Sequence, residues 1–269
     1  MQNLWVDTDI ALGSDTGDVD DGFALAAVLR AVQHHPARFR LLGASAVGGN
    51  TDAVTAFRCA RSLLAEVGMA DVPLVQAADA ADAIAALPAD TSIVALGPLT
   101  NLARALQRNP ALASQSQLRT VGGLMAPWRH PVLRFFCLNF RTDPIAARQV
   151  LSAAFAWRRN CPLDVVKQLR IGTAELVRVQ QTGALGAYLA AHTGRWLKQA
   201  PWRYASQSFP AWDLVATLDA VDQLATPRYD LAGQRLTAFD AGASFENFLA
   251  LLRAPSCPAG SASAPHAPG

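Results

Sequence analysis

A cluster of aspartates near the start of the chain is the feature with the clearest capacity for chemistry. The cluster follows apolar residues 4–6 and precedes an apolar stretch with helical spacing, and it consists of Asp7, Asp9, Asp15, Asp18, Asp20 and Asp21. Carboxylates this close together repel one another unless they are solvated, protonated or neutralised by a cation. A hard cation such as calcium takes six to eight oxygen ligands, often carboxylates. The pattern therefore indicates either a metal site or a solvated acidic loop in which Asp20 or Asp21 caps the following helix.

The elements around these aspartates are those of an α/β fold. A buried strand at 4–6 leads through the acidic loop to a helix that begins near Asp21. Further strands are expected at 39–47, 72–77, 92–96, 118–124 and near 153–157; helices at 51–68, 101–112, 144–151, 173–200 and 212–222; loops at 125–141 and 201–210; a turn at 160–162; and a hairpin at 225–239. Because strands alternate with helices, we predict an open, mainly parallel sheet with helices on both faces. Such sheets bind ligands at the carboxyl ends of their strands, where the acidic loop lies.

Length and composition restrict the class of protein. The 269 residues, 51% of them hydrophobic, predict one domain over 1–253, followed by a disordered low-complexity tail over 254–269. A net charge of +2 without a Lys/Arg block argues against a nucleic-acid partner, and no apolar run is long enough for a membrane span. The amino-terminal residues lack a signal sequence, so we expect a cytoplasmic protein. The scattered cysteines indicate neither a zinc site nor a disulfide framework.

Several short motifs stand where the predicted strands end. They are DTD…DVDDGFAL, VGGN, ALGPLTNLARAL, VGG, LNF-x-x-DPIAA and WDLVAT. Together they resemble the nucleoside hydrolase family of the inosine–uridine-preferring type, over residues from about 4 to 218. The resemblance implies a calcium-dependent (Ca2+) enzyme that hydrolyses the N-glycosidic bond of ribonucleosides or a related riboside with a metal-bound water. We also expect a homo-oligomer, a dimer or a tetramer, whose partner is a small-molecule riboside.

The resemblance also implies roles for single residues. Asp9 is similar to the carboxylate that binds calcium and takes the proton from the attacking water, and Asp7 is similar to the buried aspartate that starts the motif. Asp20 looks like the partner of the ribose 2′- and 3′-hydroxyls. The remaining implied calcium ligands are Asp21, the backbone carbonyl of Leu96, and Asp213. The implied ribose-binding asparagines are Asn50 and Asn139.

The chemistry agrees with these residue types. Breaking the C1′–N bond builds positive charge on the ribose, an oxocarbenium-like state that nearby carboxylates stabilise. Calcium would hold the water and the ribose diol together and lower the pKa of the water, so that Asp9 could accept its proton.

The sequence departs from the family pattern in four places. Residues 11–12 and 15–17 look inserted, so Asp15 or Asp18 could compete for a ligand role. Trp212 stands where the family commonly has a histidine that protonates the leaving base. Cys137 stands where a glutamate usually holds the 5′-hydroxyl, and Pro127 and Pro131 surround the place of a Gly-Asn pair.

These departures leave alternatives open. Cationic side chains on or beside the altered loop could protonate the leaving group, contact a 5′-phosphate or be solvated surface charges; they are Arg129, His130, Arg134 and Arg141. Aromatic side chains that could stack on a base or simply pack are Trp128, Trp202 and Trp212. One alternative function is a nucleoside- or ribose-binding protein with the metal site but little catalysis. Another is a phosphohydrolase, although Ile10-Ala11 after Asp9 does not match its motif.

Overall fold

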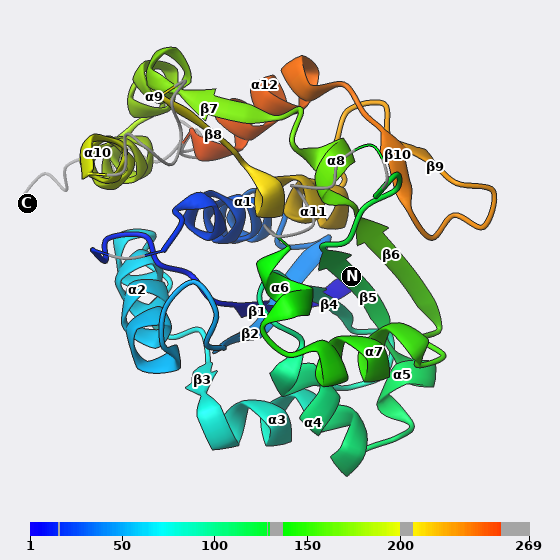
Figure 1. Ribbon diagram of the computed structural model, residues 1–269. Coiled ribbons are helices and arrows are strands. Elements are labelled where there is room, and N and C mark those ends of the chain that lie inside the picture. Colours follow the sequence, from blue (N-terminus) through cyan, green and yellow to red (C-terminus); the bar gives the residue numbers. More distant parts are fainter. Residues whose placement is uncertain (16, 128, 130–136, 200–206, 254–269) are drawn as a thin grey trace, which may run out of the picture.

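A parallel six-stranded sheet forms the centre of the molecule (Figure 1). The computed structural model describes residues 1–253 except 16, 128, 130–136 and 200–206. The strands, in spatial order, are β3 (Leu74–Gln76), β2 (Phe39–Ala46), β1 (Gln2–Thr8), β4 (Ser92–Ala95), β5 (Gln117–Val121) and β6 (Trp157–Cys161). The predicted fold class, an open and mainly parallel α/β sheet, is confirmed.

Helices cover both faces of this sheet. They are α1 (Asp20–His34), α2 (Ala53–Glu66), α3 (Ala77–Ala85), α4 (Thr100–Arg108), α5 (Leu112–Gln115), α6 (Leu138–Arg141), α7 (Pro144–Ser152), α8 (Leu163–Val166), α9 (Thr173–Gln180), α10 (Ala184–Gln199), α11 (Trp212–Ala220) and α12 (Ala241–Leu252). In Figure 1, α1 and α11 lie on one side of the sheet, and α3, α4 and α7 lie on the other.

Strand residues alternate between two hydrophobic cores, as the pleat requires. Leu4 and Val6 of β1 pack into the core that contains Phe23 of α1, whereas Trp5 packs into the core that contains Leu102 of α4. All five side chains are almost fully buried. Burial on both faces explains why β1 reads as a continuous apolar run and not as an alternating one.

The strand order reverses its direction at β1. From β1 the chain moves to β2 and β3 on one side, and then crosses back to β4, β5 and β6 on the other. Asp7, near the end of β1, pairs with Ser45 of β2 and with Ala95 of β4. Since open α/β sheets bind ligands in the crevice where the order reverses, the residues after β1 stand at the expected ligand position.

The sequence interpretation was wrong about the last strand of the sheet. A strand was expected near 153–157 and a turn at 160–162, but β6 continues to Cys161 and pairs with β5 from Gln117↔Trp157 to Val121↔Cys161. The error arose because β6 reads WRRNC, which lacks an apolar pattern. Its arginines belong in the strand because Arg159 makes an ion pair with Asp219 of α11.

Other differences concern short elements. Strand β5 ends at Val121, earlier than the predicted 124, because Gly122 and Gly123 adopt positive φ angles of 148° and 68°. Helix α6 lies in the predicted loop 125–141, and β8 (Ser208–Pro210), which pairs with β7 (Arg170–Gly172), lies in the predicted loop 201–210. The hairpin prediction is confirmed by β9 (Arg228–Tyr229) and β10 (Leu236–Ala238).

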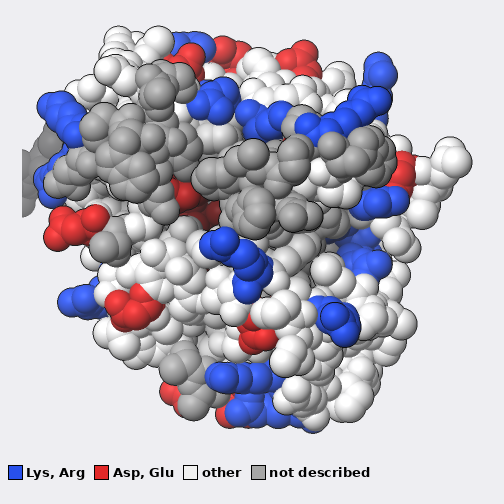
Figure 2. Space-filling view, in the orientation of Figure 1, with Lys and Arg blue, Asp and Glu red and all other residues white. Residues whose placement is uncertain are grey.

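The remaining global expectations concern the surface and the tail. No helix in the described part of the chain is long and apolar enough to cross a membrane. On the described part of the face in Figure 2, Lys and Arg lie among acidic and neutral residues, and several of them adjoin one another toward the upper right. The predicted disordered tail, 254–269, lies outside the described residues, as do Trp128, His130, Arg134 and Trp202.

Candidate active site

Four buried aspartates meet at the crevice beside β1. Asp9 follows the last residue of β1, Asp20 and Asp21 form the first turn of α1, and Asp213 lies in the first turn of α11. Helices α1 and α11 pack against each other, which brings their amino-terminal turns together. One oxygen from each of Asp20, Asp21 and Asp213 lies within 4.8 Å of the other two. The exposed fraction of each of the four residues is 5% or less.

Asn50 links two of these carboxylates. Its backbone N–H donates to Oδ2 of Asp9 at 2.7 Å, and its side-chain amide donates to Oδ2 of Asp21 at 3.1 Å. The other oxygen of Asp21 accepts from the Thr8 hydroxyl at 2.5 Å. The backbone N–H of Asp213 donates to Oδ2 of Asp20 at 3.3 Å. The cluster is therefore held by contacts between β1, α1, α11 and the loop after β2.

Two glycines enclose the carboxylate of Asp9. A Cβ atom on Gly49 would lie 2.0 Å from Oδ2, and a Cβ atom on Gly97 would lie 2.9 Å from Oδ1. Oδ1 itself is buried and has no hydrogen-bond partner among the described residues. A buried carboxylate oxygen without a donor is costly unless a proton or a cation lies beside it. The Asp9 site is therefore chemically suited to a cation.

Burial and mutual repulsion both disfavour the ionised carboxyls. Burial raises the pKa of Asp9 from 3.8 to about 7, against the hydrogen bond from Asn50 that lowers it. The pKa values of Asp20, Asp21 and Asp213 are also raised well above 3.8, first by burial and then by the neighbouring carboxylates. A cluster of this kind needs bound protons or a divalent cation to compensate its charge.

Asp7 stands apart from this cluster and has a structural role. It accepts hydrogen bonds from Ser45 Oγ of β2 at 2.6 Å and from Asn101 Nδ2 of α4 at 2.9 Å. Asn101 also donates to the carbonyl of Ala46 at 3.3 Å, at the end of β2. Burial raises the pKa of Asp7 to about 6, and the two hydrogen bonds counter this shift.

The role of Asn101 was missed in the sequence. Asn101 belongs to the GPLTN motif and lies in the first turn of α4, on the side of the helix that is otherwise apolar and buried. A polar residue at such a position could have indicated its role from the sequence. Its contacts join α4, β1 and β2 just below the site.

The carbonyl of Leu96 and the side chain of Asn139 also lie at this edge of the sheet. Leu96 follows β4, and its N–H donates to the carbonyl of Asp7 at 2.8 Å. The amide nitrogen of Asn139, on α6, donates to the Leu96 carbonyl at 2.5 Å and to the Val121 carbonyl at 3.1 Å. Asp20, Asn50, Asn139 and Asp213 thus line one cavity, Asp9 and Asp21 are joined to it through hydrogen bonds from Asn50, and the Leu96 carbonyl is joined to it through Asn139.

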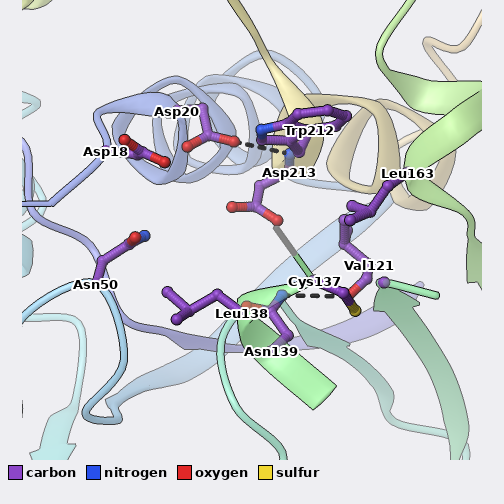
Figure 3. A pocket seen from close by; sticks show the side chains of 11 residues that line it. Asp18, Asp20, Asn50, Val121, Cys137, Leu138, Asn139, Leu163, Trp212 and Asp213 are labelled. Atoms are coloured by element: carbon purple, nitrogen blue, oxygen red, sulfur yellow. Dashed lines mark hydrogen bonds between the residues drawn. The ribbon is translucent and has the colours of Figure 1, made fainter. Parts of the chain in front are cut away.

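A cavity opens between the aspartates and α6 (Figure 3). One side carries the polar residues Asp18, Asp20, Asn50 and Asp213. The other side carries Val121, Cys137 and Leu163 with Leu138 and Asn139 beside them, whereas Trp212 lies next to Asp213. Of the cationic residues proposed for the altered loop, Arg129 and Arg141 are exposed and do not line this cavity.

The inserted loop contributes one carboxylate to the cavity. Asp18 lines it, whereas Asp15 is exposed and borders a separate groove. Gly17, between them, has a φ of 84°, and its carbonyl accepts a hydrogen bond from the indole nitrogen of Trp196 at 2.6 Å. This contact fixes the loop to α10.

Comparisons with known proteins agree with this geometry. Three solved structures share the fold: a plant nucleoside hydrolase (the PpNRh1 enzyme), the purine-preferring ribonucleoside hydrolase from Gardnerella vaginalis, and the inosine-uridine preferring nucleoside hydrolase from Bacillus anthracis. Their TM-scores are 0.74, 0.72 and 0.66, at sequence identities of 18%, 17% and 14%. The alignments cover 94%, 93% and 94% of this chain and 99%, 98% and 99% of those chains.

A search of curated proteins by sequence gave no match. The family model described as inosine-uridine preferring nucleoside hydrolase matches residues 75–244, which is more than half of the chain. The chain therefore belongs to the inosine-uridine preferring nucleoside hydrolase family of N-ribosyl hydrolases.

Proposed function

We propose that this protein hydrolyses the N-glycosidic bond of a ribonucleoside or related riboside with the help of one calcium ion, and that Asp9 is the general base. The observation that carries the proposal is the buried carboxylate cluster at the reversal of strand order, in which Oδ1 of Asp9 has no donor among the described residues. This arrangement leaves one oxygen of Asp9 available to a cation or to a proton.

The donor set fits a hard cation. Asp9, Asp21, Asp213 and the Leu96 carbonyl offer oxygen atoms only, which is the ligand chemistry that calcium prefers. Asp20 lies in the same group of oxygens as Asp21 and Asp213, so it can reach a ribose diol placed beside the ion. When bound, calcium would supply positive charge that lowers the pKa of a neighbouring water molecule.

The chain's own residues then have distinct tasks. Asn50 holds Asp9 through its backbone N–H, so that Oδ2 is fixed and Oδ1 can accept the proton of the attacking water. Asp20, Asn50 and Asn139 would bind and orient the ribose hydroxyls. As the bond to the base breaks, the carboxylates around the sugar stabilise the positive charge that develops on the ring.

The leaving group receives no proton from Trp212 in this proposal. An indole N–H donates hydrogen bonds but does not titrate, so it cannot act as an acid. We therefore propose that ribosides with good leaving groups, such as p-nitrophenyl riboside, are cleaved better than inosine or uridine. We also propose a dimer or a tetramer and a cytoplasmic location.

The test combines metal content with matched variants. Protein purified without chelator is expected to contain about one calcium per chain, and chelation is expected to abolish turnover of p-nitrophenyl riboside. Asp9→Asn should lower kcat/KM at least about 10²-fold, the low end for loss of a general base. Asp15→Asn, which removes an exposed carboxylate outside the cavity, is the control and should leave kcat/KM unchanged.

Two outcomes would count against the proposal. A well-folded, metal-free protein that cleaves the riboside normally would remove calcium from the mechanism. Calcium bound at the site without turnover of any of the three ribosides would instead support a ribose-binding protein.

A further inference from the structure

The loop before α1 contributes a carboxylate that is additional to the proposed calcium and ribose ligands. Asp18 is half-buried and lines the active-site cavity beside Asp20 (Figure 3). Asp213 lines the same cavity. None of the described residues that line it is a lysine, an arginine or a histidine, so the described lining is anionic.

The position of Asp18 follows from the packing of this loop. The carbonyl of Gly17 accepts a hydrogen bond from the indole nitrogen of Trp196, on α10, at 2.6 Å. A Cβ atom on Gly17 would lie 2.6 Å from the Cβ atom of Ala11 and 2.8 Å from the carbonyl oxygen of Asn50. Gly17 is thus enclosed by α10, by the start of its own loop and by the loop after β2. These contacts hold Asp18, the next residue, at the cavity.

Calcium would compensate only part of the charge at this site. The proposed ligands Asp9, Asp21 and Asp213 carry one negative charge each when ionised, and the ion carries two positive charges. Asp20 and Asp18 add two further carboxylates at the cavity. Three of the five negative charges therefore have no compensating cation, and such an excess attracts cations and repels anions.

We propose that Asp18 is a specificity-determining residue that favours positively charged ribosides, and that N-ribosylpyridinium compounds are the preferred substrate class. The inference rests on the proposed function and names its substrate class. A cationic riboside gains attraction from the uncompensated carboxylates, a neutral riboside gains little, and an anionic riboside is repelled. This selection depends on the net charge of the riboside, whatever its orientation in the cavity.

A pyridinium leaving group also suits Trp212, whose indole does not titrate. When the C1′–N bond of a ribosylpyridinium breaks, its electron pair passes to the ring nitrogen, and the base departs as a neutral pyridine that needs no proton. Water forms the new C1′–O bond and gives its proton to Asp9. The positive charge passes from the pyridinium ring to the ribose in the transition state, where the carboxylates stabilise it.

The test compares ribosides that differ in charge. 1-Ribosylnicotinamide is a cation, whereas 1-ribosylnicotinate carries a compensating carboxylate on the same ring. We expect kcat/KM to be higher for the cation. Asp18→Asn removes the charge at nearly constant size and should lower the ratio of the two kcat/KM values at least about 3-fold, within the range of one partly exposed charge pair. Asp18→Glu keeps the charge and should keep the ratio. In the wild-type protein the ratio should also fall as sodium chloride screens the carboxylates.

The matched control lies in the same loop. Asp15→Asn removes one exposed carboxylate that does not line the cavity, so the ratio should stay the same. Equal effects of Asp15→Asn and Asp18→Asn would assign the selection to the charge of the whole loop and overturn the role of Asp18. A wild-type preference for 1-ribosylnicotinate, or a ratio that Asp18→Asn leaves unchanged, would also overturn the proposal.

Binding tests the charge selection separately from hydrolysis. 3-Ribosyl-N-methylpyridinium and 3-ribosyltoluene have the same shape, differ by one charge and contain a C1′–C bond that is not hydrolysed. Calorimetry with calcium present should show at least about 3-fold tighter binding of the cation, and Asp18→Asn should remove most of this difference. If the difference is found but no riboside is cleaved, the proposed hydrolase function fails and the charge selection stands. If ribosides are cleaved but the two C-ribosides bind equally, the function stands and the charge selection is refuted.

Discussion

Gly49 offers a direct way to displace the Asp9 carboxylate without changing any charged residue. A Cβ atom at this position would lie 2.0 Å from Oδ2 of Asp9 and 2.7 Å from Cδ of Pro98. Real Cβ atoms essentially never approach closer than 3.0 Å, so in Gly49→Ala the carboxylate must move by about 3.0 − 2.0 = 1.0 Å. Pro98 limits the movement of the new methyl group away from Asp9.

A displacement of this size is expected to affect both metal binding and catalysis. A shift of about 1 Å in a reacting group can cost roughly 10²-fold in rate. We therefore expect Gly49→Ala to lower kcat/KM for p-nitrophenyl riboside about 10²-fold and to weaken calcium binding, measured by titration of the chelated protein. The circular dichroism spectrum should keep its α/β character, because Gly49 lies outside the strands and helices.

The neighbouring glycine is the matched control. A Cβ atom on Gly48 would meet Ala53 N and Thr51 O at 3.7 Å, which is ordinary van der Waals contact. Gly48→Ala should therefore keep calcium affinity and turnover close to those of the wild-type protein. Equal losses in both variants would show that the loop tolerates no side chain for another reason, and wild-type behaviour of Gly49→Ala would refute the position that we assign to Asp9.

Three further predictions concern stability. Asp219→Asn removes the buried carboxylate that pairs with Arg119 and Arg159, so we expect the free energy of unfolding to fall by roughly 3–5 kcal/mol and the Tm, measured by calorimetry, to fall by roughly 6–20 °C. Asp222→Asn changes an exposed ion pair and should alter the Tm little, and equal effects of the two substitutions would contradict the burial argument. Because burial raises the folded-state pKa of Asp9 from 3.8 to about 7, the contribution of Asp9 to the urea stability of the calcium-free protein should be full below pH 3.8 and be lost as the pH rises through about 7; a stability difference between wild type and Asp9→Asn that does not change with pH would contradict this. Asp213→Asn relieves repulsion among the carboxylates, so it should raise the Tm of the chelated protein. It should also abolish the increase in Tm on addition of calcium, because one ligand is lost; an increase as large as that of the wild-type protein would remove Asp213 from the ligand set.

The sequence was sufficient to predict the parts of the fold that follow from periodicity and from turn chemistry. The apolar run of β1, the helix that starts at the paired aspartates and the alternation of strands with helices each have a local cause. Strand β6 could not be predicted, because WRRNC is stabilised by partners distant in the chain. Arg159 contacts Asp219 and Tyr229, and Arg119 of β5 lies over the ring of Trp157.

The candidate site followed a similar division. Aspartates near the end of β1 could be placed at a strand end from sequence alone, because parallel strands present their carboxyl ends at one edge. Burial of Asp9 between Gly49 and Gly97 depends on three loops that meet only in the folded chain. For the same reason, the sequence did not indicate that Asp18 lines the cavity whereas Asp15 borders a separate groove, since both belong to one acidic loop.

The arrangement of α1 beside α11 has a consequence for the covalent continuity of the chain. Asp20 and Asp213 are 193 positions apart in the sequence, yet they share a hydrogen bond, and Asp21 and Asp213 lie in the same group of oxygens. An ion bound between them would close most of the polypeptide into a loop. A link of this kind lowers the conformational entropy of the unfolded chain, and the effect grows with the length of the loop. A single backbone cut anywhere between the two aspartates would then leave two fragments joined through calcium. Adding a chelator would weaken the association of the two fragments, which the packing of α1 against α11 also holds together.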